Sequence, residues 1–271
     1  MDRLAEIANR LVEVSGVVGV CLGGSRARGT HRSDSDYDLG LYYRPPLDTT
    51  TLRLLAAELT SKPVEVTEPG GWGPWVDGGG WLTIDGQHVD WIYRDIDRVH
   101  RVWQQCQAGQ FEIGAQPGHP LGVYSHAYAG EVALGRILAD PTGELQALQE
   151  QTRLYPEPLR EALIDNAQWE APFILAGARK GASRGDAFYV AGCLFRAVGL
   201  LVHALHAHAR KWVLNEKGAV QAAGGLPAAP EDFAGRAHGL FSALGTTPET
   251  LAAALDDADR LVAEVGHELA R

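Results

Sequence analysis

The segment GGSRARGTHRSDSDYDLG, residues 23–40, constrains the fold of this chain more than any other stretch. It begins with two glycines and a serine and ends with aspartates at alternate positions. The runs on either side of it, VVGVCL at 17–22 and YDLGLYY at 37–43, are short and apolar, a pattern that predicts buried strands. We therefore predict a polar loop between two buried strands, a position where functional groups are common.

The two aspartates that close this loop predict a metal site. Asp36 and Asp38 fall two residues apart on the second predicted strand, so both carboxylates leave the same face of it. Tyr37 and Leu39 point to the opposite, buried face. Carboxylates at this spacing repel each other unless a cation lies between them. Mg²⁺ fits, because it binds through one or two carboxylates and takes further ligands from substrate phosphates.

The start of the loop predicts a phosphate site. Gly24 and Ser25 follow the first strand, where glycines let backbone N–H groups approach a phosphate and a hydroxyl adds a donor. Arg26, Arg28 and Arg32 add positive charge. An isolated Asp-x-Asp pair is more often a solvated turn. Here it follows Gly-Ser after ten residues and lies between two strands, so the combination indicates a site for a Mg–nucleoside triphosphate.

These residues resemble the signature of the nucleotidyltransferase superfamily related to DNA polymerase beta. That signature is a hydrophobic strand, Gly-Ser, a spacer, and then Asp-hydrophobic-Asp-hydrophobic, supplied here by Gly24-Ser25 and by Asp36 to Leu39. Within the superfamily the chain most resembles bacterial enzymes that adenylylate aminoglycoside or lincosamide antibiotics. The motif covers a short part of the chain, whereas the likeness of layout extends over all of it.

The resemblance implies an activity and a set of roles. A nucleoside monophosphate, AMP from ATP, would pass to a hydroxyl of a small acceptor, with one or two Mg²⁺ ions at Asp36 and Asp38. Arg28 lies three residues after Ser25, where the similar enzymes place a phosphate-binding arginine. Their helical domain also contributes a lysine to the triphosphate, and Lys217 matches it here.

The family pattern also requires a third carboxylate on a later strand, and QHVDWIYRD provides it. Asp90 shares a strand face with His88 and Ile92, and a lone aspartate in an apolar strand is costly to bury without a partner. We predict that Asp90 binds the catalytic metal and accepts the proton of the attacking hydroxyl. Asp85 is the alternative, but its place in the predicted Asp85-Gly86 hairpin turn already accounts for it.

The order of patterns along the chain predicts two domains. Strand patterns at 17–22, 37–43, 64–68 and 81–95 alternate with helical ones, and from about residue 95 helical patterns dominate. We predict an α/β (α+β) nucleotidyltransferase domain with a mixed sheet over 1–140, followed by an all-α helical bundle over 141–271. Helices are expected near 95–108, 125–138, 142–153, 157–180, 185–212, 230–244 and 247–270.

Composition limits the partners. A formal net charge of −10 argues against a nucleic-acid partner and suits a small or cationic acceptor. The three cysteines are scattered and odd in number, which favours free thiols in the cytoplasm. No membrane association is expected, because the apolar run at 189–209 contains Arg196 and three histidines and fits a buried helix better than a membrane span.

Two alternatives remain open at this point. A regulatory or antitoxin-like binding protein of the same fold would not need a general base, and a transferase acting on RNA would need a basic stripe. The second alternative also includes a transferase acting on a protein. Trp72, Trp75 and Trp81 cluster around a glycine-rich loop, where they either anchor the loop or stack on an adenine or a substrate ring.

Overall fold

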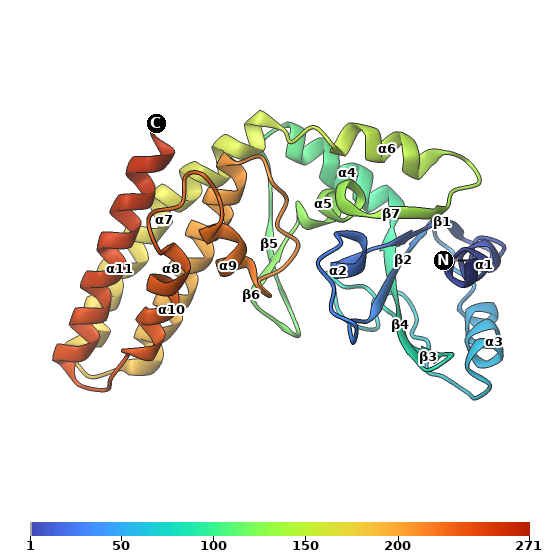
Figure 1. Ribbon diagram of the computed structural model, residues 1–271, viewed down its shortest axis with the longest axis horizontal. Coiled ribbons are helices and arrows are strands. Elements are labelled where there is room, and N and C mark those ends of the chain that lie inside the picture. The colour runs from blue at the N-terminus through green and yellow to red at the C-terminus, as the bar shows by residue number, and fades with distance from the viewer. Residues whose placement is uncertain (1) are drawn as a thin grey trace. The chain divides into compact units, whose positions relative to one another are not determined.

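The computed structural model describes residues 2–271 and divides the chain into two compact units. The first unit contains the residues up to 105 together with 111–154, and the second contains 106–110 and 155–271. The predicted fold class is confirmed: an α+β N-terminal part with a mixed sheet precedes a helix-rich C-terminal part (Figure 1). The domain boundary placed at residue 140 stays a prediction.

The first unit is built on a five-stranded sheet with the order β3-β4-β2-β1-β7. Strands β2 and β4 run parallel, and every other neighbouring pair is antiparallel. The strands are β1 (Val17–Leu22), β2 (Tyr37–Tyr43), β3 (Gly79–Ile84), β4 (Gln87–Asp95) and β7 (Arg136–Ala139), and the helices are α1 (Asp2–Leu11), α2 (Gly24–Ala27), α3 (Thr49–Thr60), α4 (Ile96–Gln107), α5 (Ala127–Leu134) and α6 (Glu144–Thr152).

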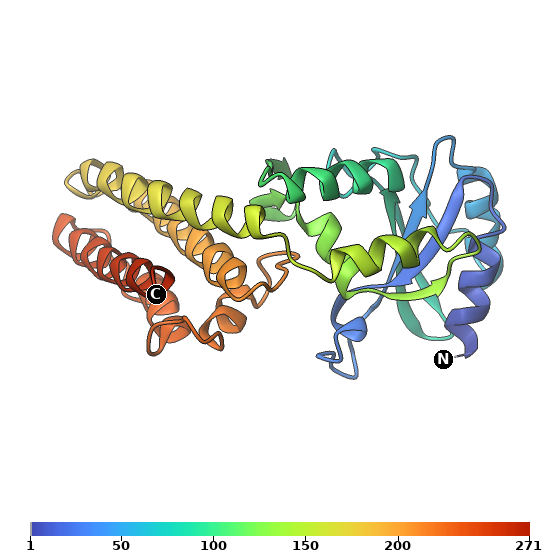
Figure 2. The same ribbon diagram turned by 90° about the horizontal axis from the view of Figure 1, so that it is seen from above.

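One face of this sheet forms the core of the first unit. Leu39 of β2, Leu82 of β3 and Trp91 of β4 are almost completely buried on it, and residues of α1 and α3 belong to the same hydrophobic cluster. Helices α1 and α3 lie side by side, joined by the ion pair of Arg10 with Glu58 (Figures 1 and 2). The alternation of apolar and polar residues predicted along β2 and β4 is what turns this face inward.

The opposite face is covered only in part. Tyr42, near the end of β2, is buried there, and Leu145 of α6 packs against β1. Toward the start of β2 and β4, Asp38 and Asp90 are only half-buried. The loop that follows β1 and contains α2 extends past the strands at this end (blue, Figure 2). The uncovered end of the face is thus the end that holds the predicted site.

The hairpin turn between β3 and β4 is confirmed. Asp85 and Gly86 both have positive φ, +51° and +78°, as a two-residue turn of the primed type requires. The turn sets the register of the hairpin, pairing Ile84 with Gln87 and, three residues earlier, Trp81 with Asp90.

Some expected elements differ from the structure. The run at 64–68 is not a strand, because only Val66 forms a bridge, to Gly80, before the chain leaves the sheet. The helix expected at 125–138 ends at Leu134, and the residues after Gly135 form β7 instead. The last helix begins with a capping box made by Thr247 and Thr250.

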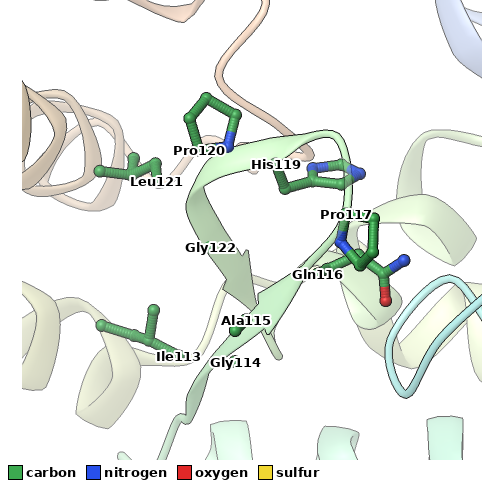
Figure 3. Close-up of a pocket in the computed structure, with 9 residues that line it drawn as sticks. All are labelled: Ile113, Gly114, Ala115, Gln116, Pro117, His119, Pro120, Leu121 and Gly122. Carbon is green, nitrogen blue, oxygen red and sulfur yellow. The ribbon is translucent and has the colours of Figure 1, made fainter.

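A hairpin of β5 (Ile113–Gln116) and β6 (His119–Tyr124) was not expected, because its sequence is rich in glycine and proline and lacks alternation. A pocket lies against this hairpin. Among its lining residues, Ile113 and Leu121 lie on one side of the hairpin, and His119 and Gln116 lie on the other (Figure 3). The Gln116 side chain accepts hydrogen bonds from the N–H groups of Trp75 and Val76 and donates to the carbonyl of Trp72. The hairpin therefore anchors the glycine-rich loop at 70–78.

The second unit is helical. Its helices are α7 (Glu157–Ala182), α8 (Ala187–His208), α9 (Ala219–Gly224), α10 (Phe233–Ser242) and α11 (Pro248–Leu269). Helix α8 lies in its core with Leu194 and Leu205 fully buried. Among the residues that the structure describes, α8 has the length and hydropathy of a membrane span, but 67% of its apolar window is buried inside the unit. This burial supports the interpretation of α8 as a core helix.

Candidate functional site

The structure brings Asp38 and Asp90 together. They are register partners in the parallel pair β2–β4, so their side chains leave the sheet side by side on its partly open face. Asp36 comes immediately before β2, which begins at Tyr37, and its side chain is exposed. The strand face predicted for both aspartates therefore applies to Asp38 alone, because Asp36 lies outside the strand.

The three carboxylates interact electrostatically. The pKa of Asp90 is raised to about 6, first by burial and then by the negative charges of Asp38 and Asp36, while His88 acts in the opposite direction. Burial and like charges both disfavour the ionised carboxylate, and both effects are usual at functional sites. Asp85, the alternative third carboxylate, instead pairs with Arg3 at 3.2 Å in the exposed hairpin turn.

The donor set fits a magnesium ion. Asp36, Asp38 and Asp90 offer only carboxylate oxygens, the hard ligands that Mg²⁺ prefers, and a cation would relieve the repulsion that raises the pKa of Asp90. Across residues 2–271, no group of three or more His, Cys, Asp or Glu side chains is placed so that it could hold a metal ion by itself. A bound ion would therefore take further ligands from substrate phosphates, as Mg²⁺ commonly does.

A glycine turn lies directly against this carboxylate pair. The N–H of Gly23 donates to the carbonyl of Asp38 at 2.7 Å, and α2 begins at the next residue. Gly24 has a φ of +62°, and a Cβ built on it would lie 1.8 Å from Oδ2 of Asp38. Only glycine satisfies both the backbone conformation and the space. Ser25 follows in the same helical turn and is half-buried.

The three arginines of the loop make different contacts. Arg26 donates through Nε and Nη2 to the carbonyl of Ser35, at 2.9 and 2.6 Å, and its guanidinium lies 3.8 Å from the centre of the Tyr37 ring. Arg32 pairs with a neighbouring aspartate of the loop. Arg28 donates through Nε to the carbonyl of Gly24 at 3.1 Å and is otherwise exposed. Arg28 is thus the arginine placed beside the glycine turn, whereas Arg26 closes the loop.

Lys217 belongs to the second unit. It lies in the segment between α8 and α9, is exposed, and its backbone N–H donates to the side chain of Asn215 at 3.0 Å. Its role toward a triphosphate stays a prediction.

The tryptophans separate into two groups. Trp72 and Trp81 stack on each other, with ring centroids 4.5 Å apart and planes at 15°. Trp75 instead packs against Tyr128 and carries the guanidinium of Arg98 over its ring at 4.5 Å. Trp75 therefore anchors the loop, whereas stacking of Trp72 or Trp81 on a bound ring stays a prediction.

The contact between Gly24 and Asp38 makes a specific prediction. We expect Gly24→Ala to lower the rate of nucleotidyl transfer by about 10²-fold, because its Cβ displaces the Asp38 carboxylate and a misplacement of 1 Å costs about that much. Gly29→Ala is the matched control: its φ is +70°, but a Cβ there meets nothing within 4 Å. The control should lose about 1–2 kcal/mol of stability to backbone strain and little activity. Equal loss of activity per folded molecule in both variants would contradict the contact.

Comparison with known protein families gives two matches. Residues 1–69 match the family model described as a nucleotidyltransferase domain, and residues 125–217 match a domain of unknown function (DUF4037). The first match contains Gly24, Ser25, Asp36 and Asp38, and Asp90 lies outside both. The N-terminal match supports nucleotidyl transfer as the general activity.

No curated protein is significantly similar to the chain. A solved structure, that of a nucleotidyltransferase-like protein from Exiguobacterium sibiricum 255-15, shares 13% sequence identity with it. The match has a TM-score of 0.48 and covers 97% of this chain and 75% of that one.

Proposed function

We propose that this protein is a Mg²⁺-dependent nucleotidyltransferase that moves AMP from ATP to a hydroxyl group of a small acceptor. One observation carries the proposal: Asp38 lies beside Asp90 and against a glycine turn that admits no side chain, within a segment that matches a nucleotidyltransferase domain. Carboxylates for a metal and backbone groups for a phosphate meet there, which is the combination that a Mg–triphosphate requires.

Each residue has a role in this reaction. Asp36 and Asp38 would hold Mg²⁺, and Asp90 would help to bind it. The bound metal neutralises charge on the phosphates and stabilises the attacking and leaving oxygens. Asp90 also accepts the proton of the acceptor hydroxyl, whose oxygen bonds to the α-phosphorus as the bond to pyrophosphate breaks. Burial and the neighbouring carboxylates raise the pKa of Asp90 to about 6 without a metal, and a bound cation would favour the ionised carboxylate that accepts the proton.

The remaining residues bind the triphosphate. The N–H groups at Gly24 and the hydroxyl of Ser25 face the β- and γ-phosphates in this proposal, and Arg28 neutralises their charge from beside the turn. Lys217 adds a further positive charge from the second unit. These contacts hold the leaving group in place while the acceptor approaches.

The acceptor is small and cationic in this proposal, similar to an aminoglycoside antibiotic, so that the protein would confer antibiotic resistance. The support is the net charge of −10, since acidic side chains can pair with ammonium groups. The three cysteines are free and buried, which fits the reducing cytoplasm as the place of action. A nucleic-acid partner is not part of the proposal.

Binding of Mg–ATP should stabilise the protein. A ligand that binds only the folded state adds about 2.7 kcal/mol of stability at a hundredfold excess over its dissociation constant. Thermal unfolding with ATP and Mg²⁺ should show this gain, and EDTA should remove most of it, because the carboxylates bind the triphosphate through the metal. An unchanged melting temperature at saturating Mg–ATP would count against the nucleotide site.

Turnover is tested directly by pyrophosphate release. The protein is incubated with Mg²⁺, each of the four nucleoside triphosphates and a panel of hydroxyl-bearing antibiotics. Release that requires both ATP and one of the acceptors supports the proposal. Nucleotide binding without release under any of these conditions would instead indicate a regulatory binding protein.

A further inference from the structure

An exposed tryptophan continues the row of carboxylates across the sheet. Trp81 of β3 is the register partner of Asp90, which is in turn the partner of Asp38 (β3 and β4 are labelled in Figure 1). Directly opposed residues share a sheet face with Cβ atoms about 5 Å apart, so the Trp81 indole stands next to the Asp90 carboxylate. Its side chain is 69% exposed, which is unusual for so large an apolar group.

The Trp72 ring packs against the Trp81 indole. The two rings stack at 4.5 Å, and the edge of Trp72 lies above Gly79, where an added Cβ would come within 3.1 Å of it. The Trp72 N–H donates to the carbonyl of Asp77 at 3.0 Å, and its carbonyl accepts from Gln116 at 2.6 Å. Its backbone is thus held on both sides, so the Trp72–Trp81 pair is a preformed surface.

The order of Asp38, Asp90 and Trp81 across the sheet indicates which substrate the Trp72–Trp81 pair faces. The glycine turn touches Asp38 on the β1 side of the row, and Trp81 lies at the β3 side, beyond Asp90. In an in-line displacement the attacking and leaving oxygens are on opposite sides of the phosphorus. If the leaving pyrophosphate lies toward the glycine turn, the attacking acceptor must approach from the Trp81 side.

We propose that the stacked Trp72–Trp81 pair is the acceptor subsite, which takes the flat face of a ring-shaped alcohol that carries ammonium groups. This proposal rests on the proposed function. An indole face attracts cations and apolar C–H surface alike, and the neighbouring Asp90 receives the hydroxyl of the same ring. The surface would select acceptors by ring shape and positive charge. The residues around Asp38 would bind the nucleotide.

The test separates acceptor binding from nucleotide binding. Wild type, Trp81→Ala and Trp81→Phe are titrated by calorimetry with Mg–ATP, with Mg–tripolyphosphate, and with kanamycin in the presence of Mg²⁺ and a non-hydrolysable ATP analogue. Kanamycin is a cyclic alcohol with several ammonium groups. Leu54→Ala is the matched control, because Leu54 is 68% exposed and belongs to α3, which covers the opposite face of the sheet.

We expect Trp81→Ala to weaken kanamycin binding by about tenfold, the effect of losing one good cation–aromatic contact. Mg–ATP and Mg–tripolyphosphate should bind to it as to wild type, Trp81→Phe should recover part of the loss, and Leu54→Ala should change nothing. In steady-state kinetics, Trp81→Ala should raise the KM for kanamycin more than it lowers kcat.

Two results would overturn the acceptor subsite. Weaker binding of Mg–ATP with unchanged binding of Mg–tripolyphosphate would show that the pair holds the adenine base. If kanamycin binding is equal in wild type and Trp81→Ala, or absent from both, this surface does not bind this class of acceptor. Failure of wild type to bind Mg–ATP would be a different result, because it contradicts the proposed function itself.

Discussion

Asp38→Asn is expected to lose nucleotidyl transfer by at least about 10³-fold, since a metal at a transferring phosphoryl group contributes several kcal/mol and each 1.36 kcal/mol is a factor of ten. Asp38 is the carboxylate that contacts the glycine turn and is also the register partner of Asp90. An amide at this position keeps the shape of the side chain but removes the charge that holds the metal.

The fold should survive this change. The negative charge of Asp38 raises the pKa of Asp90, which means that the two carboxylates repel each other when no cation is bound. Removing one charge should therefore leave the melting temperature in EDTA equal to that of wild type or higher. Binding of Mg–ATP should at the same time be lost.

The matched control for this experiment is Asp34→Asn. Asp34 belongs to the same loop and the change removes the same charge, but its carboxylate is exposed and pairs with Arg32. Pyrophosphate release and thermal unfolding are measured on both variants. Substantial turnover by Asp38→Asn with Mg²⁺, or an equal loss in Asp34→Asn, would rule out the metal role of Asp38.

Asp90→Asn is expected to separate binding from chemistry. Asp36, Asp38 and the phosphates can hold Mg–ATP without a third carboxylate, so the dissociation constant should stay within about an order of magnitude of the wild-type value. The single-turnover rate should fall by a factor of roughly 10²–10⁴, because a positioned general base contributes about that much.

Nucleotide titration and single-turnover transfer are measured on the same Asp90→Asn sample. Asp85→Asn is the control, since Asp85 lies in the turn of the same hairpin and pairs with Arg3 on the surface. It should keep both binding and rate. A near-normal rate per folded molecule for Asp90→Asn, accompanied by lower stability, would show that Asp90 is a structural residue of the strand.

Much of the site could be predicted from the sequence because it depends on local patterns. The Gly-Ser turn and the Asp-x-Asp pair are separated by a short loop, and alternation along the second strand assigns each side chain to a face. The Asp85-Gly86 turn even determines that Trp81 opposes Asp90, because a two-residue turn leaves one register for the hairpin.

Other local patterns were misleading because tertiary contacts decided their outcome. The alternating run at 64–68 has the composition of a strand, yet only Val66 finds a partner, and the carboxylate of Glu68 instead accepts from Thr49 at 2.7 Å. The hairpin at 113–124 has no alternation, yet it forms, and its Gln116 fixes the loop that holds Trp72.

The sequence by itself predicted the candidate site residues and the strand faces of Asp38 and Asp90, since turn types and side-chain alternation act over a few residues. Only the tertiary structure decided that β4 lies parallel to β2 in the register that places Asp90 beside Asp38. Parallel strands are joined by long crossovers, so their register depends on packing across the whole sheet, and no local pattern specifies it. The same packing presses Gly24 against Asp38 and leaves Trp81 exposed at the far end of the row.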